Sequence, residues 1–172
     1  MEKKNIDWGN LGFAYMPTEK RYVSNYKDGA WDDGCLTEDD KVVISECAGV
    51  LQYAQTVFEG MKAYTTEDGR TVVFRPDLNA KRLKDSAERL EMPAFPEERF
   101  LDAIRQLVTA NEAYVPPYGS GASLYIRPYI FGTNPVIGVK PADEYQFRAF
   151  TTPVGPYFKG GVKPLTIKVS DF

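Results

Sequence analysis

The sequence predicts an α+β domain whose sheet is mostly antiparallel, with helices packed on one side. Strand-like runs come first, followed by a helical stretch, a hairpin, two longer helices and more strands. This order lacks the regular alternation of strand and helix that builds a doubly wound parallel sheet. A chain of 172 residues with 43% hydrophobic residues can also bury a core of its own.

The first quarter of the chain is expected to contain a hairpin and one further strand. Residues 21–27 have the composition of a strand and lead into Asp28-Gly29, a dipeptide typical of tight β-turns. Residues 30–31 then begin the return strand. The apolar run at residues 41–44 predicts another short strand.

Between residues 45 and 58 the hydrophobic period changes to that of a helix. Apolar residues share one helical face at positions Val50, Ala54, Val57 and Phe58. Gly60 follows where a helix would stop. A second hairpin is expected next, with strands at residues 61–66 and 71–75 around a polar turn that contains Gly69.

Two long helices follow, near residues 78–91 and 97–114. Pro76 marks the start of the first, and Pro93 ends it. The second begins after Pro96 with an acidic first turn, which suits the positive end of a helix dipole. Apolar residues keep the helical period in both segments, at Leu83, Ala87 and Leu90, and at Phe100, Ile104, Leu107 and Val108.

The last third of the chain predicts strands at residues 122–130 and 144–151, joined by a turn-rich segment. Residues 153–161 contain two prolines and three glycines, which is the composition of a linker. Residues 165–170 then open a new strand. We therefore expect a small domain at residues 1–152, an interdomain loop at 153–161 and the start of a truncated large domain at 162–172.

Composition excludes several classes of function. A net charge of −3 disfavours nucleic-acid binding, and no apolar run approaches a membrane span. The absence of histidine removes Ser-His and Cys-His catalysis and His-ligated metals, and no metal site is expected. Cys35 and Cys47 are expected to be reduced thiols, and the first residues lack a signal peptide, so the expected location is the cytoplasm.

Two groups of residues are candidates for anion binding. Arg82 lies near the start of a predicted helix, where a phosphate could bind, although from these residues alone a solvated helix face is the favoured explanation. Tyr125 and Arg127 are two residues apart in a strand, so both side chains face the same way and could receive a carboxylate. The alternative for this pair is the solvent face of an edge strand.

The charged residues Glu59 and Lys62 stand at a predicted helix-to-strand junction, where such a pair is usually surface decoration. A lysine that forms a Schiff base needs desolvation or a neighbouring cation, and no lysine here has such a context. Lys62, Lys159 and Lys168 are candidates only by elimination.

Four stretches together resemble one enzyme family. They are residues 51–64, 74–83, 123–128 and 152–158, and they include Phe58-Glu59-Gly60-Met61-Lys62 and Leu124-Tyr125-Ile126-Arg127-Pro128. They resemble the branched-chain amino-acid aminotransferases, which are fold type IV enzymes dependent on pyridoxal 5′-phosphate. The resemblance runs from about residue 11 to the end of the chain and implies the small N-terminal domain of such an enzyme.

The resemblance implies transfer of the amino group of Leu, Ile or Val to 2-oxoglutarate by a homodimer. It assigns Arg82 and Tyr53 to the cofactor and Tyr15, Tyr125 and Arg127 to the substrate. It also implies three further substrate-site residues. Ile137 and Val139 would lie in a loop that reaches the neighbouring subunit, and Tyr157 would lie in the mobile interdomain loop. The segment after Tyr15 departs from a Thr-Asp-His run found in many members.

The same resemblance places the lysine that binds pyridoxal phosphate beyond Phe172. No catalytic residue is therefore expected within this chain, which alone should be inactive and carry no covalently bound cofactor. Two alternatives remain open. One is a non-catalytic, dimerising fragment, and the other is a different fold type IV enzyme, such as a D-amino-acid aminotransferase or an aminodeoxychorismate lyase.

Overall fold

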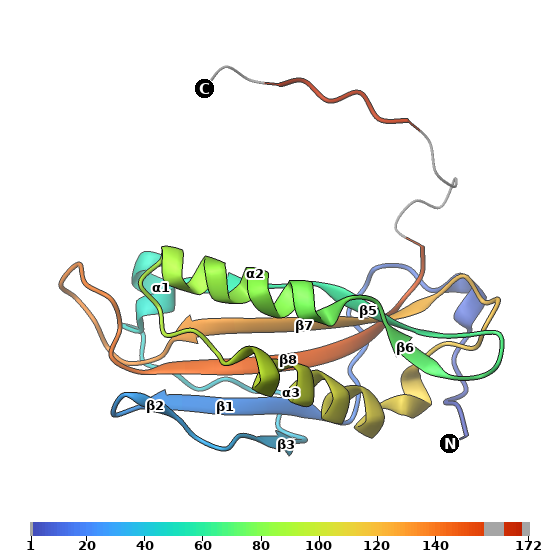
Figure 1. Ribbon diagram of the computed structural model, residues 1–172, viewed down its shortest axis with the longest axis horizontal. Helices are drawn as coiled ribbons and strands as arrows, with labels where there is room; N and C mark the ends of the chain where they lie inside the picture. The colour runs from blue at the N-terminus through green and yellow to red at the C-terminus, as the bar shows by residue number, and fades with distance from the viewer. Residues whose placement is uncertain (1, 157–163, 170–172) are drawn as a thin grey trace.

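The computed structural model describes residues 2–156 and 164–169 and shows one antiparallel sheet with two long helices across it (Figure 1). The helices are α1 (Gly49–Tyr53), α2 (Pro76–Arg89) and α3 (Glu97–Ala110), with short 3-10 turns at Trp8–Asn10 and Glu112–Tyr114. The strands are β1 (Arg21–Lys27), β2 (Ala30–Trp31), β3 (Cys35–Thr37), β4 (Thr56–Phe58), β5 (Met61–Thr65), β6 (Thr71–Val73), β7 (Ser123–Gly132) and β8 (Tyr145–Val154).

The sheet follows the order β2-β1-β8-β7-β5-β6, with β3 added to β1 and β4 added to β7. Every strand pair is antiparallel. The two longest strands, β7 and β8, pair over their whole length and form the centre of the sheet. The predicted α+β class with an antiparallel sheet is therefore confirmed.

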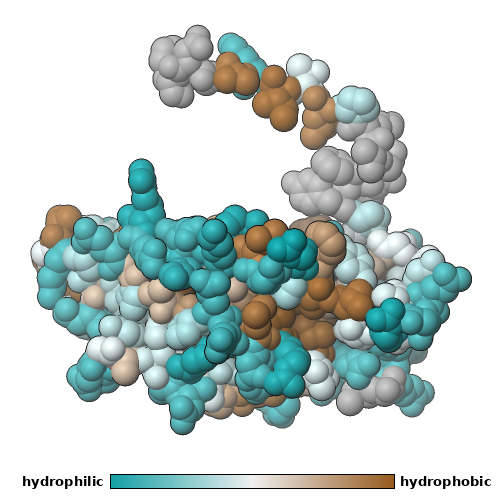
Figure 2. All heavy atoms as spheres, in the orientation of Figure 1, coloured by the Kyte–Doolittle hydropathy of each residue, from teal (hydrophilic) through white to brown (hydrophobic). Residues whose placement is uncertain are grey.

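Helices α2 and α3 cover one face of the sheet, and the hydrophobic core lies between them and that face (Figure 1). The period of the helices explains their buried residues, which include Leu83 and Ala87 of α2 and Phe100, Ile104 and Leu107 of α3. The sheet contributes alternate residues of β7 and β8, namely Leu124, Ile126, Ile130, Phe147 and Ala149. Figure 2 shows further hydrophobic side chains that reach the surface between α2, α3 and β6.

Both predicted hairpins are confirmed, by the pairs β1–β2 and β5–β6. The two long helices are also confirmed, with shifted ends. Helix α2 begins at Pro76, because proline suits the first helical turn. Helix α3 ends at Ala110, where the Asn111 side chain bonds to the Lys20 backbone and to the Leu107 carbonyl.

The strand predicted at residues 41–44 was wrong, and β3 at Cys35–Thr37 takes its place beside β1. Val43 is 95% exposed, so its strand-like composition finds no packing partner. The Lys41 carbonyl instead accepts a hydrogen bond of 2.9 Å from Arg148 Nη1. This segment therefore folds over the sheet as a loop rather than joining its edge.

The helix predicted at residues 45–58 was also largely wrong. Only α1 is helical, and it ends because Ala54 adopts a left-handed conformation with φ of 50°. Residues 56–58 instead pair with β7 as β4, and this pairing buries Val57. Gly60 consequently separates two strands rather than ending a helix.

The C-terminal part of the chain differs from expectation in two respects. Strand β8 continues to Val154, so Pro153 and Val154 belong to the sheet and not to the predicted linker. The strand predicted at 165–170 is absent from its described part, since residues 164–169 are exposed and pair with no other described segment. A β-strand needs a partner for its backbone hydrogen bonds.

Both cysteines, Cys35 and Cys47, are free thiols, as expected. None of the helices in the described part of the chain has the length and apolar character needed to cross a bilayer.

Candidate active site

The face of the sheet opposite the helices carries three of the predicted substrate residues, Tyr15, Tyr125 and Arg127. Along β7, Leu124, Ile126 and Ile130 are buried against the helices, so the alternate side chains point to the other face. Tyr125 and Arg127 are among these, as their spacing predicted. Because β7 lies between β8 on one edge and β4 and β5 on the other, the edge-strand alternative was wrong. We call this surface the open face.

Tyr125 and Arg127 form a hydrogen-bonded pair on the open face. The Tyr125 hydroxyl accepts bonds from Arg127 Nη2 at 2.7 Å and Nε at 3.2 Å. The Arg127 guanidinium also lies 4.4 Å from the centre of the Phe58 ring. Among the described residues no carboxylate pairs with Arg127, so its charge is available to a ligand.

Aromatic rings border this pair. Phe58 is 60% exposed, and Phe13 from the N-terminal segment packs edge-on against Tyr125 with ring centres 6.0 Å apart. Gly60 lies directly under the Tyr125 hydroxyl, where a Cβ atom would collide with it. The absence of a side chain at Gly60 therefore lets Tyr125 lie flat toward the β4–β5 junction.

A pocket of 280 Å³ joins this region to helix α2. Its lining includes Gly60, Lys62, Asn79 and Tyr125. Lys62 is the direct neighbour of Tyr125 across β5 and β7. Tyr125 therefore borders a pocket that is also lined by α2, the helix that carries Arg82.

Arg82 is held by a buried carboxylate. Glu59 is only 8% exposed, and its carboxylate accepts bonds from Arg82 Nε at 2.8 Å and Nη2 at 2.7 Å. Asn79 Nδ2 donates a third bond of 2.7 Å to the same group. This pairing raises the pKa of Arg82. Surface decoration was therefore the wrong interpretation of Glu59, which links α2 to the β4–β5 junction.

Contrary to the prediction, Arg82 does not lie at the start of α2, because the helix begins six residues earlier at Pro76. Its side chain is 62% exposed, and Nη1 makes no hydrogen bond within the described residues. An anion would therefore be bound by the guanidinium itself rather than by the backbone N–H groups of the helix end.

Replacing Arg82 by glutamine is expected to lower the Tm by about 4–8 °C, because the buried Glu59 carboxylate then keeps only Asn79 as a side-chain partner. Glu59→Gln should cost less than half of this, since the released guanidinium is already exposed to water. Arg75→Gln is the matched control, because Arg75 directly precedes the same helix and pairs with Asp77 on the protein surface. Thermal unfolding followed by circular dichroism measures the Tm of each variant. An equal decrease in Tm for Arg82→Gln and Arg75→Gln would contradict this prediction.

Tyr53, Ile137 and Val139 come together at a different end of the domain. The Tyr53 hydroxyl donates to the Ile137 carbonyl, and Tyr53 and Val139 border the same cavity of 450 Å³. Ile137 and Val139 are 73% and 91% exposed, in the loop between β7 and β8. This loop projects beyond the end of the sheet (Figure 1). The single chain therefore does not bring these three residues to Tyr125.

Tyr15 lies over the open face. Its ring packs edge-on against Phe150, which is the β8 partner of Arg127 in the sheet. Its hydroxyl accepts a bond of 3.1 Å from Arg21 Nη2. Tyr15, Tyr125 and Arg127 thus share one surface, whereas Tyr157 and Lys159 lie outside the described residues. Lys168 is exposed and belongs to no helix or strand.

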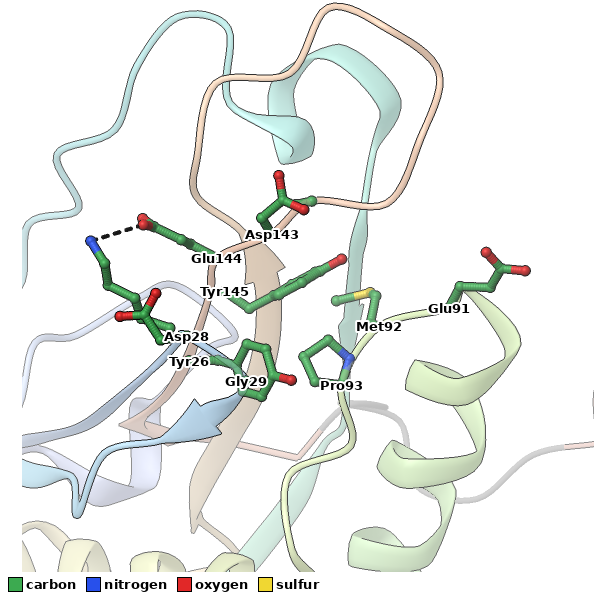
Figure 3. Close-up of a pocket in the computed structure, with 11 residues that line it drawn as sticks. Tyr26, Asp28, Gly29, Glu91, Met92, Pro93, Asp143, Glu144 and Tyr145 are labelled. Atoms are coloured by element: carbon green, nitrogen blue, oxygen red, sulfur yellow. Dashed lines mark ion pairs between the residues drawn. The ribbon is translucent and has the colours of Figure 1, made fainter.

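A cavity of 620 Å³ lies elsewhere, between the β1–β2 turn and the segment after α2. Figure 3 shows that its carboxylates point apart, with Glu91 and Asp28 on opposite sides and Glu144 paired with Lys27 at 3.0 Å. No group of three or more potential metal ligands occurs among the described residues. This cavity therefore offers no convergent chemistry.

Sequence reasoning missed the roles of Phe58, Phe13 and Glu59. A helix was predicted through Phe58, which hid the two-residue period that places Phe58 and Thr56 on the open face. The Glu59–Arg82 pair joins residues 23 positions apart and follows from no local pattern. Gly60 was the one local signal of this arrangement, because a glycine within a strand region often marks a place where another group packs closely against the backbone.

Comparison with known proteins gives a consistent result. The family model for class IV aminotransferases matches residues 56–168. A branched-chain-amino-acid aminotransferase of Haemophilus influenzae is 47% identical over 98% of this chain and 49% of its own length. The corresponding enzyme of Helicobacter pylori is 49% identical over 93% of this chain and 47% of its own length. The chain therefore spans about half the length of these relatives.

Solved structures show the same fold. A branched-chain aminotransferase from Thermoproteus uzoniensis, crystallised with norvaline, matches with a TM-score of 0.65 and 25% identity, over 83% of this chain and 43% of that one. The T.th. branched-chain amino acid aminotransferase in complex with N-(5′-phosphopyridoxyl)-L-glutamate matches with a TM-score of 0.59 and 26% identity, over 78% and 41%. The family model matches more than half of the chain, and the chain belongs to the class IV aminotransferase family.

Proposed function

We propose that this chain is the substrate-binding half of a branched-chain amino-acid aminotransferase that uses pyridoxal 5′-phosphate. The observation that carries the proposal is the Tyr125–Arg127 pair, which presents a positive charge between aromatic rings and pairs with no carboxylate among the described residues. Its substrates would be Leu, Ile or Val and 2-oxoglutarate. The relatives named for this activity, at 47% and 49% identity, support the assignment.

The residues present fit a phosphate-bearing cofactor. Arg82 Nη1 has no hydrogen-bond partner in the described part of the chain, while Glu59 fixes the other side of the guanidinium, so a phosphate can bind without first ordering a flexible side chain. When bound, pyridoxal phosphate supplies an electron sink for cleavage of the Cα–H bond and a carrier for the amino group. In our proposal the lysine that holds the cofactor lies outside this chain, which spans about half the length of its relatives.

The side chains of this chain bind and orient the substrate. Arg127 attracts a carboxylate, and the Tyr125 hydroxyl can donate its own proton to the same group because it already accepts from Arg127. Phe58 and Phe13 offer an apolar wall suited to an aliphatic side chain. The fixed Arg127–Tyr125 geometry would hold the Cα–H bond in one orientation toward the cofactor.

Tyr53, Ile137 and Val139 fit a homodimer. They lie together at the end of the sheet away from Tyr125, and Val139 is almost fully exposed in a projecting loop. We propose that this loop reaches the active site of the second subunit, while Tyr53 steadies it through the Ile137 carbonyl. The two free thiols suit a reducing, cytoplasmic location.

Amino-group transfer by the full-length enzyme is the test. We expect turnover of L-leucine with 2-oxoglutarate, a visible absorption band from bound cofactor and no turnover of D-alanine. Turnover of D-alanine without L-leucine would assign a D-amino-acid aminotransferase instead. A dimer that binds no pyridoxal phosphate and turns over neither amino acid would support the non-catalytic alternative.

A further inference from the structure

A second cavity opens on the same sheet face, and Tyr15 is a proposed substrate residue that also lines it. It measures 370 Å³, and its floor is formed by Arg21 of β1, Arg148 of β8 and Tyr129 of β7. Arg148 is paired with Tyr129 on one side and with Val23 on the other, and Arg21 is two residues from Val23. The three side chains therefore point to one face from adjacent strands.

Both arginines are buried without a carboxylate partner in the part of the chain that the structure describes. Arg21 is 5% exposed and Arg148 is 7% exposed. The nitrogen atoms of Arg148 donate to neutral oxygens, the Lys41 carbonyl at 2.9 Å, the Asp39 carbonyl at 2.7 Å and the Gln146 amide at 3.3 Å. Arg21 donates to the Thr18 carbonyl and the Tyr15 hydroxyl.

Buried charge is costly unless a charge of opposite sign compensates it. Two such guanidiniums border one cavity, so the electrostatic potential inside it is positive and favours an anion. Asp40 also lines the cavity, but its carboxylate pairs with Lys41 at 3.0 Å. Lys41 lines the cavity too, and the balance of three cations against one carboxylate remains positive.

Two hydroxyl groups add unused donors. The Tyr129 hydroxyl makes no hydrogen bond within the described residues, and burial raises the pKa of Tyr129, so its proton stays in place. The Tyr15 hydroxyl accepts from Arg21, which leaves its own proton free. Hydrogen-bond donors therefore outnumber carboxylates in the lining of this cavity, where Asp40 is the one acidic residue.

We propose that this cavity binds a small oxyanion, a phosphate or carboxylate group, between Arg21 and Arg148 with the Tyr129 hydroxyl as a third donor. A cavity of 370 Å³ accommodates such a group with part of its hydration shell. Because Arg21 bonds to Tyr15, the bound anion would also fix the ring that stands beside the proposed substrate site. Arg82 and Arg127 take no part in this cavity.

Isothermal titration calorimetry of the purified chain with inorganic phosphate, and separately with succinate, tests the proposal at low ionic strength. Tyr129→Phe removes one donor without changing the charge and is expected to weaken binding about five- to tenfold. Asp40→Asn removes the competing carboxylate and should strengthen anion binding several-fold. Arg82→Gln should leave the affinity unchanged, which separates this cavity from any phosphate bound at α2.

Arg148→Gln should abolish anion binding. If Arg148→Gln does not fold, Tyr129→Phe still tests the proposal. Binding of phosphate alone would identify a phosphate group, and equal binding of succinate would identify a carboxylate as an alternative ligand. Absence of binding by both at millimolar concentration would overturn the proposal. Binding that is lost in Arg82→Gln and unchanged in Tyr129→Phe would also overturn it, and would leave the proposed aminotransferase function intact.

Discussion

Replacing Phe147 by alanine is expected to lower the free energy of unfolding by about 3–5 kcal/mol. Phe147 is fully buried at the centre of β8. Its ring stacks on Phe95 with centres 4.0 Å apart and contacts Tyr22 and Phe100 edge-on, both at 6.1 Å. These rings join the sheet to α3 and to the segment before it, so a smaller residue would leave a cavity that the fixed strand cannot close.

Phe150 provides the matched control, because it is a phenylalanine of the same strand that points to the open face. It is partly exposed and contacts Tyr15 and Tyr129. Phe150→Ala should cost about 1–2 kcal/mol, as expected for partial burial of a ring. Urea unfolding measures the free energy of unfolding of both variants, and we expect their m-values to equal that of the parent. Equal costs would contradict the assignment of the helix-covered face as the core.

The parts of the fold that follow from local pattern were predictable. Asp28-Gly29 specified a hairpin turn, and the helical period of Leu83, Ala87, Phe100 and Ile104 specified which residues α2 and α3 bury. In each case the local preference and the final packing agree. The same holds for the two-residue spacing of Tyr125 and Arg127, which sufficed to place both on one face.

The failures occurred where tertiary contacts decide. Residues 56–58 fit a helical period as well as a strand, and pairing with β7 selects the strand. Residues 41–44 are β-prone, but β3 already pairs with β1 at Arg21 and Tyr22, so they form a loop instead. The Glu59–Arg82 pair depends on how α2 crosses the sheet, which no local spacing reveals.

The resemblance alone placed Tyr53, Ile137 and Val139 in the candidate site, and within one chain they lie apart from Tyr125. They cluster with one another and not with Tyr125, because α1 and the β7–β8 loop lie at the end of the sheet where β7 finishes. Residues from a second subunit cannot be located by any pattern within one sequence. Their contribution therefore rests on the proposed dimer.

Substituting Arg127 by glutamine in the full-length enzyme is expected to reduce kcat/KM for L-leucine about 100-fold. Glutamine keeps a polar group but loses the charge that would bind the substrate carboxylate, and charge-assisted bonds contribute about 1.5–3 kcal/mol. Because each factor of ten corresponds to about 1.4 kcal/mol, that range includes the expected loss. Arg127→Lys should recover only part of it, since an ammonium group cannot bond to Tyr125 and a carboxylate in the same planar arrangement.

Arg105→Gln is the control for this substitution, because Arg105 lies on α3, across the sheet from the open face, and pairs with Asp102 on the surface. It should leave kcat/KM unchanged, and both variants should keep the circular dichroism spectrum of the parent. The loss in Arg127→Gln should appear for 2-oxoglutarate as well, since each substrate carries a carboxylate beside the reacting carbon. Wild-type kinetics for Arg127→Gln would show that the open face does not bind the substrate carboxylate and would remove the main support for the proposed function.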